Sequence, residues 1–284
     1  MSIHPRHATF TGVAGNRLEA DIYGHGERTA LLLHGGGQTR HAWRGAARKL
    51  AERGFTAIPV DQRGHGDSEW VKGGHYGFLD YADDAALLGR QIEERFGTKP
   101  VAIGASLGGM ASLTAIGREP CFSALILVDI VPRVEEEGVR HVHAFMQARV
   151  EDGFATIEEA AEQVAAYLPN RTRPPSVDGL RKNLRQKPNG RWYWHWDPAF
   201  MTGLRTPAMD RQQAVETMEA AAKSLTVPTL LVRGGASDIV TPAAAKAFLD
   251  VVPHARLVDV GGAGHMVAGD KNDVFAAAII DFLG

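Results

Sequence analysis

The chain has 284 residues, enough for one large domain or for a domain that carries an insertion. Its hydrophobic content of 44% and charged content of 23% are typical of a globular protein. A formal net charge of −2 argues against general attraction to nucleic acid or anionic lipid, and the single cysteine, Cys121, excludes internal disulfides and cysteine-built metal sites.

The N-terminal stretch, MSIHPRHATF, lacks the apolar run of a signal peptide. No stretch of about 18 apolar residues is present anywhere in the sequence, so no membrane span is expected. We therefore expect a cytoplasmic protein that has no membrane partner and no nucleic-acid partner.

Short apolar runs alternate with helical patterns along most of the chain. The runs predict strands at 29–35, 55–60, 99–105, 123–130, 228–235 and 255–261. Helical spacing predicts helices at 39–54, 79–97, 107–117 and 271–283. Near-continuous apolar strands that alternate with helices indicate an α/β fold with a mostly parallel sheet and helices on both faces.

Residues 132–223 break this alternation, because they contain no convincing buried strand. They separate two predicted strands that should be neighbours in the sheet, and they resemble several helices plus a loop rich in Pro, Arg and aromatic residues. We expect a helical cap at 132–223, inserted between two parts of one core, 1–131 and 224–284.

Ser106 lies between Gly104 and Gly108, directly after the apolar run at 99–105 and directly before a predicted helix. The glycines indicate a tight turn in which a strand and a helix meet without room for β-carbons. Such a turn lifts the serine hydroxyl away from the sheet, and the free N–H groups of the helix start suit a developing oxyanion. Ser106 is therefore the candidate nucleophile.

The chain resembles the α/β-hydrolase superfamily, in which a G-x-S-x-G turn between a strand and a helix carries the serine nucleophile. The resemblance rests on five segments in the expected order: HGGG at 34–37, DQRGHGDS at 61–68, GASLGG at 104–109, SD at 237–238 and GH at 264–265. It covers nearly the whole chain and implies an α/β-hydrolase fold, with the 132–223 insertion as its cap.

The family order Ser, acid, His implies a base near the C-terminus. His265 follows the last predicted strand at the correct sheet edge, whereas His254 precedes that strand and so belongs to the opposite edge. We expect His265 to be the general base.

Two aspartates compete for the acid that orients this histidine. Asp238 follows the strand next to the last one and is the preferred candidate, with Asp129 at the end of LILVD as the alternative. Asp61 also ends a strand, but the family's sheet order puts that strand out of reach.

Backbone N–H groups of Leu107 and Gly36 are the expected oxyanion donors, with Gly37 as the alternative to Gly36. His34 is expected to brace the oxyanion loop. Structural roles are also expected for Arg63, His65 and Asp67, which match loop-shaping positions of the family.

The cap stretch GRWYWHWDP contains Trp192, Trp194 and Trp196, which share one face if the segment is extended. They either bind an apolar or planar substrate or anchor the cap to the core. The same alternation predicts that His195 points the other way, toward solvent.

A serine nucleophile with a histidine base implies an acyl-enzyme, so we expect hydrolysis of a small ester or lactone without cofactor or metal. Relatives that open epoxides or displace halide carry a carboxylate at the elbow, which disfavours those activities here. The alternatives are a C–C bond hydrolase, a cofactor-free perhydrolase resembling haloperoxidases, and a ligand receptor on the same fold. The sequence leaves the oligomeric state open.

Overall fold

The computed structural model describes residues 4–167, 176–206, 211–266 and 271–284. Eight strands form one sheet in the order β1-β2-β4-β3-β5-β6-β9-β10. Their bounds are β1 Arg6–Thr11, β2 Arg17–Ile22, β3 Arg28–Leu33, β4 Phe55–Val60, β5 Val101–Ala105, β6 Ala124–Val128, β9 Thr229–Gly234 and β10 Arg256–Val260. The six strands from β4 to β10 in this order are parallel, which confirms the predicted mostly parallel sheet.

The antiparallel strands β1 and β2 at one end of the sheet are absent from the sequence prediction. In β1, exposed and buried residues alternate, and polar residues such as Arg6 and His7 interrupt any apolar run. In β2, five of the six residues are buried, but the charged residues Glu19 and Asp21 interrupt its apolar run, so both strands lack the continuous apolar signal of the central strands.

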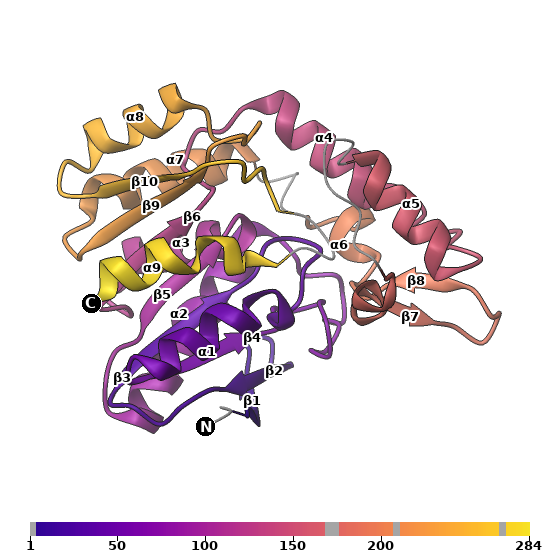
Figure 1. The fold of residues 1–284 in the computed structure, drawn as a ribbon, viewed down its shortest axis with the longest axis horizontal. Coiled ribbons are helices and arrows are strands. Elements are labelled where there is room, and N and C mark those ends of the chain that lie inside the picture. The colour runs from indigo at the N-terminus through magenta and orange to yellow at the C-terminus, as the bar shows by residue number, and fades with distance from the viewer. Residues whose placement is uncertain (1–3, 168–175, 207–210, 267–270) are drawn as a thin grey trace.

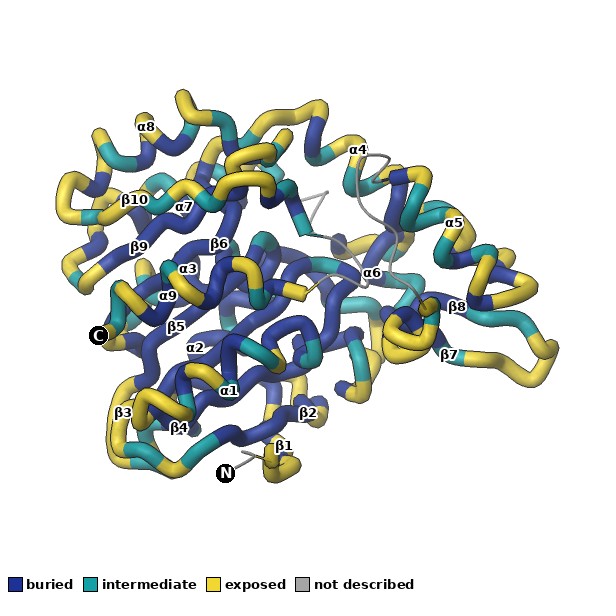
Figure 2. Tube along the Cα trace, in the orientation of Figure 1, coloured by how far each residue is buried: buried dark blue, intermediate teal, exposed yellow. Residues whose placement is uncertain are grey.

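Helices cover both faces of the sheet (Figure 1). Helices α1 (Arg44–Glu52) and α9 (Ala276–Leu283) pack on one face, and α2 (Phe78–Phe96) and α3 (Leu107–Arg118) pack on the other. Alternate residues of β3 serve the two cores: Leu32 belongs to the first, and Leu31 and Leu33 belong to the second. Figure 2 shows the central strands buried and the outer helices with exposed faces.

Most of the segment between β6 and β9 projects beyond the sheet, at the right of Figure 1, and only its last helix packs beside the core. It contains α4 (Glu136–Gln147), α5 (Ile157–Tyr167), the strands β7 (Leu184–Gln186) and β8 (Trp192–Trp194), α6 (Ala199–Thr202) and α7 (Arg211–Ser224). β6 and β9 are neighbours in the sheet, so this segment is an insertion in the main sheet's topology.

Two features of the insertion differ from the sequence prediction. β7 and β8 form an antiparallel hairpin within a segment expected to be helical. Helix α7 packs against α3, where Ala221 lies so close to Gly117 that a β-carbon at Gly117 would overlap it. Since α7 belongs to the helical layer of the core, we propose that the cap ends near residue 206 and not at 223.

Candidate active site

Ser106 occupies a strained turn between β5 and α3. Its backbone has φ 45° and ψ −112°, a region that non-glycine residues rarely adopt and that costs on the order of 1–3 kcal/mol. The two flanking glycines are sterically required, because a β-carbon at Gly104 would overlap the Gly108 carbonyl and one at Gly108 would overlap the Leu33 carbonyl. Strain of this kind, held by close packing, is typical of functional positions.

His265 is paired with Asp129 and not with Asp238. The Nδ1 atom of His265 lies 2.7 Å from Oδ2 of Asp129, and both side chains are about 4% exposed. The Ser106 N–H donates to the carbonyl of Val128, which directly precedes Asp129. The carboxyl ends of β5 and β6 therefore bring Ser106, Asp129 and the loop that carries His265 to one place.

The expected pairing of Asp238 with His265 is wrong. Asp238 lies in the turn after β9 with half of its side chain exposed, and its carboxylate is 3.8 Å from Nδ1 of His141 on α4. It therefore faces the cap surface. The alternative acid, Asp129, follows β6 directly and points its carboxylate toward the histidine loop. His254, the other histidine near the C-terminus, is exposed and contacts the carbonyl of Val227 at the opposite sheet edge.

Three groups hold the Asp129 carboxylate. Besides His265, the Ser237 hydroxyl donates to Oδ2 at 2.7 Å, and the Gly234 N–H donates to Oδ1 at 3.0 Å. Asp129 also has a positive φ of 53°, so the backbone is strained at this second polar position as well. Sequence reasoning missed Ser237, although it belongs to the SD pair that was used to select Asp238.

The Nε2 atom of His265 makes no hydrogen bond within the described part of the chain, and none joins it to the Ser106 hydroxyl. A neutral imidazole that donates from Nδ1 to Asp129 carries an acceptor lone pair on Nε2. Catalytic hydrogen bonds are often long in structures without substrate, so this arrangement leaves Nε2 available as a base.

In the turn that follows β3, next to the serine, one backbone N–H has no acceptor among the described residues. Gly35 lies against Ser106, since a β-carbon at Gly35 would be 3.5 Å from the serine Cβ. Its N–H is bound by the Gln38 side chain, and the Gly37 N–H is bound by Nε2 of His65. Among the described residues no acceptor is found for the Gly36 N–H.

At the Ser106 elbow, too, some backbone N–H groups have acceptors and others do not. The N–H groups of Ser106 and Gly108 donate to the carbonyls of Val128 and His34, whereas the Leu107 N–H has no acceptor in the described ranges. Within 35–38 and 106–108, the N–H groups of Gly36 and Leu107 are thus the ones without an acceptor among the described residues, and both were nominated from the sequence as oxyanion donors.

Three buried histidines brace the loops below this turn. Nε2 of His34 accepts from the Gln62 N–H, Nε2 of His65 accepts from Gly37, and Nδ1 of His195 accepts from the Gly66 N–H at 2.7 Å. Burial lowers the pKa of His34 to about 4 and that of His65 to about 3, and it lowers the pKa of His195 as well. All three rings bind backbone groups, which agrees with the structural roles expected for His34 and His65.

The other residues of the 61–68 loop also make structural contacts. Buried Asp61 pairs with Arg40, which also binds Asp67 at 2.9 Å. The Arg63 guanidinium binds the carboxylate of Asp84 through two hydrogen bonds of 2.6 Å. These ion pairs fix the loop on which the histidines rest.

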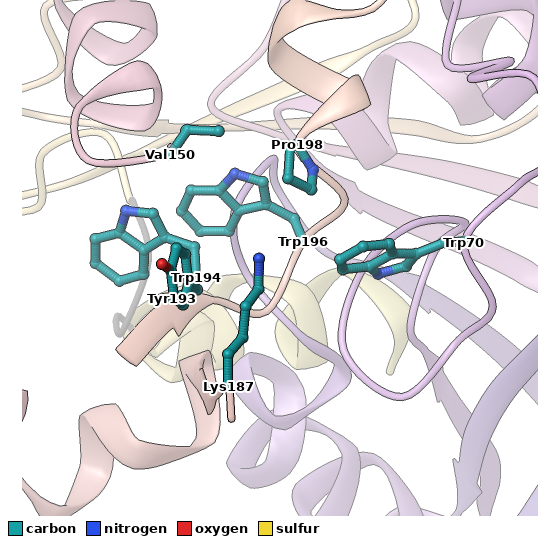
Figure 3. Close-up of a pocket in the computed structure, with 7 residues that line it drawn as sticks. All are labelled: Trp70, Val150, Lys187, Tyr193, Trp194, Trp196 and Pro198. Carbon is teal, nitrogen blue, oxygen red and sulfur yellow. The ribbon is translucent and has the colours of Figure 1, made fainter. Parts of the chain in front are cut away.

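The cap tryptophans make mostly protein contacts. Trp194 and Trp196 are buried and stacked with ring centroids 4.9 Å apart, and Trp192 lies beside the guanidinium of Arg181. Figure 3 shows a small pocket that Trp194 and Trp196 line together with Trp70, Val150, Lys187, Tyr193 and Pro198. These contacts favour the anchoring alternative over substrate binding. The expectation that His195 points toward solvent is wrong, because the residue is only 1% exposed.

Residues 24–272 match the family model described as serine aminopeptidase, S33. The chain belongs to this family of α/β-hydrolases. It is 28% identical over 268 residues to an esterase of Mycobacterium tuberculosis, which covers 91% of this chain and 84% of the esterase. It is 31% identical over 242 residues to a 2-(acetamidomethylene)succinate hydrolase of Mesorhizobium japonicum, which covers 83% of this chain and 80% of that enzyme.

The fold comparison agrees with the sequence comparison. The crystal structure of E-2-(acetamidomethylene)succinate hydrolase superposes with a TM-score of 0.79 at 26% identity and covers 98% of this chain and 99% of that one. The chain is therefore an α/β-fold hydrolase enzyme.

None of the helices in the described ranges is long and apolar enough to cross a bilayer. No group of three or more His, Cys, Asp or Glu side chains in the same ranges is placed to hold a metal ion.

Proposed function

We propose that this enzyme is a serine hydrolase that cleaves small esters or lactones through an acyl-enzyme. In this proposal Ser106 is the nucleophile, His265 is the general base and Asp129 orients His265. The observation that carries it is the buried 2.7 Å contact between His265 and Asp129, beside a strained serine elbow. Asp129 takes the role that the sequence assigned to Asp238.

The first half-reaction follows from these positions. Nε2 of His265 takes the hydroxyl proton as Oγ of Ser106 bonds to the carbonyl carbon, and the carbonyl electron pair moves onto its oxygen. The N–H groups of Gly36 and Leu107 stabilise that oxyanion, and Asp129 stabilises the imidazolium. As the C–O bond to the leaving group breaks, His265 returns the proton to the departing alcohol oxygen.

Water completes the cycle by the same route. His265 takes a proton from water, and the hydroxide oxygen adds to the acyl carbon. Collapse of the second tetrahedral intermediate releases the acid and returns the proton to Oγ of Ser106. Loss of one oxyanion donor costs about 3–4 kcal/mol of barrier in other hydrolases, so both N–H groups matter.

The surroundings of the oxyanion loop support an uncharged acyl group. The Sδ atom of Met146 and the ring of Phe200 each lie 3.6 Å from the position that a β-carbon on Gly36 would occupy. The named activity of the M. tuberculosis relative, esterase, is consistent with this class of substrate. The same three groups also fit C–C bond hydrolysis and perhydrolysis, so a substrate panel must separate these reactions.

The test is hydrolysis of p-nitrophenyl acetate and butyrate by the unmodified enzyme and by Ser106→Ala. The rate should fall by at least about 10³-fold in the variant, because members of such a triad act as a unit. The panel adds a simple lactone, 2-(acetamidomethylene)succinate, a vinylogous diketone, and halide with peroxide in acetate. Equal turnover by the unmodified enzyme and Ser106→Ala would reject Ser106 as the nucleophile. Turnover of only the diketone would indicate a C–C bond hydrolase, and activity only with halide and peroxide would indicate a perhydrolase.

A further inference from the structure

The turn that contains Gly36 is contacted by a polar side chain of the cap, His195. Residues 35–38 form a β-turn, in which the Gln38 N–H donates to the Gly35 carbonyl at 3.1 Å. Gly37, at the third position, has φ +74°, the pattern of a type II turn that requires glycine there. Gly36 is the second residue of this turn.

Rigid peptide planes connect the turn to the Gly36 N–H, which has no acceptor in the part of the chain that the structure describes. The Gly36 N–H shares a plane with the Gly35 carbonyl, and the Gln38 N–H shares a plane with the Gly37 carbonyl. Since the Gln38 N–H is bonded to the Gly35 carbonyl, the orientation of the Gly37 carbonyl is coupled to the direction of the Gly36 N–H. A group that binds the Gly37 carbonyl therefore helps to aim that donor.

His195 is that group. Its Nδ1 faces the Gly66 N–H, which can only donate, so Nδ1 is the acceptor. In the neutral ring the proton is then on Nε2, which lies 3.1 Å from the Gly37 carbonyl and donates to it. Among the described cap residues, no other side chain makes a hydrogen bond to residues 35–38, although Met146, Trp196 and Phe200 lie beside the turn.

We propose that His195 is a positioning residue for the oxyanion hole. The inference rests on the proposed function, because it assigns Gly36 as an oxyanion donor. Arg185 of β7 joins the β7–β8 hairpin to the 61–68 loop, because its guanidinium binds the Gly66 carbonyl at 3.2 Å and the Asp67 carboxylate at 2.8 Å. Arg185 does not touch the turn, so it is the matched control.

Two substitutions of His195 separate its contact with Gly66 from its contact with Gly37. In His195→Asn the amide reaches only the Nδ1 position, so it retains the Gly66 contact and loses the Gly37 contact. In His195→Gln the amide nitrogen reaches the Nε2 position and restores the donor to Gly37. Arg185→Gln removes a fastening of the hairpin and leaves the turn untouched.

The experiment measures kcat and KM for p-nitrophenyl butyrate, with rates normalised to active sites titrated by a fluorophosphonate. His195→Asn should lower kcat by about 10- to 100-fold, less than the full loss of a donor, and change KM by less than about threefold. Affinity for an alkyl boronic acid, whose boron bonds to Oγ of Ser106 while the hydroxyl proton goes to His265, should fall by a similar factor. His195→Gln should recover most of the loss, and Arg185→Gln should keep kcat while melting earlier.

A purely structural His195 predicts a different result. The melting temperature of His195→Asn would fall, while kcat per titrated site would stay within about twofold of the unmodified enzyme, and that outcome overturns the proposal. If His195→Asn does not fold, the Nε2–H resonance of His195 in the unmodified enzyme decides: it should shift when the boronate forms, and an unchanged resonance overturns the coupling. Absence of ester turnover in the unmodified enzyme would instead reject the proposed function.

Discussion

Replacing Asp129 by asparagine should disable the enzyme far more than the same change at Asp238. Each oxygen of the Asp129 carboxylate faces an N–H donor: Oδ2 faces Nδ1 of His265, and Oδ1 faces the Gly234 N–H. An amide has one oxygen, so either orientation turns its NH₂ group toward one of these donors. Satisfying Gly234 turns the NH₂ toward the histidine, which selects the tautomer whose Nε2 carries a proton and cannot act as a base.

The size of the effect follows from this tautomer argument. In a well-studied serine protease the equivalent change lowers kcat about 10⁴-fold, and we expect a loss of about 10³- to 10⁴-fold here. That range corresponds to about 4–5.5 kcal/mol of transition-state stabilisation. A buried donor left without a partner should also lower the free energy of unfolding by about 1–3 kcal/mol. Asp238→Asn changes an exposed side chain and should leave the rate within about twofold.

The assay is steady-state hydrolysis of p-nitrophenyl butyrate by the two variants, with folding checked by thermal melting. Loss of activity confined to Asp238→Asn would refute the reasoning and restore the acid inferred from sequence. Activity of Asp129→Asn within about tenfold of the unmodified enzyme would show that the buried contact does not orient the base.

Further predictions concern stability. Because burial lowers the pKa of His34 to about 4 and that of His65 to about 3, only the unfolded chain takes up these protons just below pH 6.5. The two residues should remove about 4 kcal/mol of unfolding free energy between pH 7 and pH 5, measured by urea titration, and a flat profile would contradict their buried neutral state. Gly108→Ala should cost more than about 2 kcal/mol through overlap with the Leu33 carbonyl, whereas Gly179→Ala, with open space around it, should be nearly neutral; equal melting temperatures would contradict the packing at the elbow. Ser106→Gly should abolish activity yet raise the unfolding free energy by about 1–2 kcal/mol, since glycine tolerates φ 45°; a less stable variant would show that the elbow is unstrained.

The sequence predicted the central strands and the serine elbow well, because continuous apolar runs and paired glycines are local signals. The acid was misassigned because Asp129 and Asp238 both follow strands near the histidine loop. The direction of each side chain depends on the backbone angles after the strand, and these could not be predicted from the sequence. The positive φ at Asp129 turns its carboxylate inward.

His195 was misplaced for a related reason. Alternation along the stretch 192–196 predicts that His195 points away from the tryptophans, and the expectation of solvent exposure assumes that one face of this stretch is solvated. Here His195 is bound by the Gly66 N–H of the 61–68 loop, and His195 is buried just as Trp194 and Trp196 are. The missing signal was tertiary: the backbone groups of Gly37 and Gly66 that bind this histidine lie more than a hundred residues away in the chain.

The most direct test of the account is mass spectrometry of the enzyme after reaction with an ester-mimicking fluorophosphonate. One adduct per chain should form, and peptide mapping should locate it on Ser106. The Ser106→Ala variant should not react, and the Asp129→Asn variant should react far more slowly than the unmodified enzyme. An adduct on another residue, or equal labelling of Ser106→Ala, would contradict the assignment of Ser106 as an activated nucleophile.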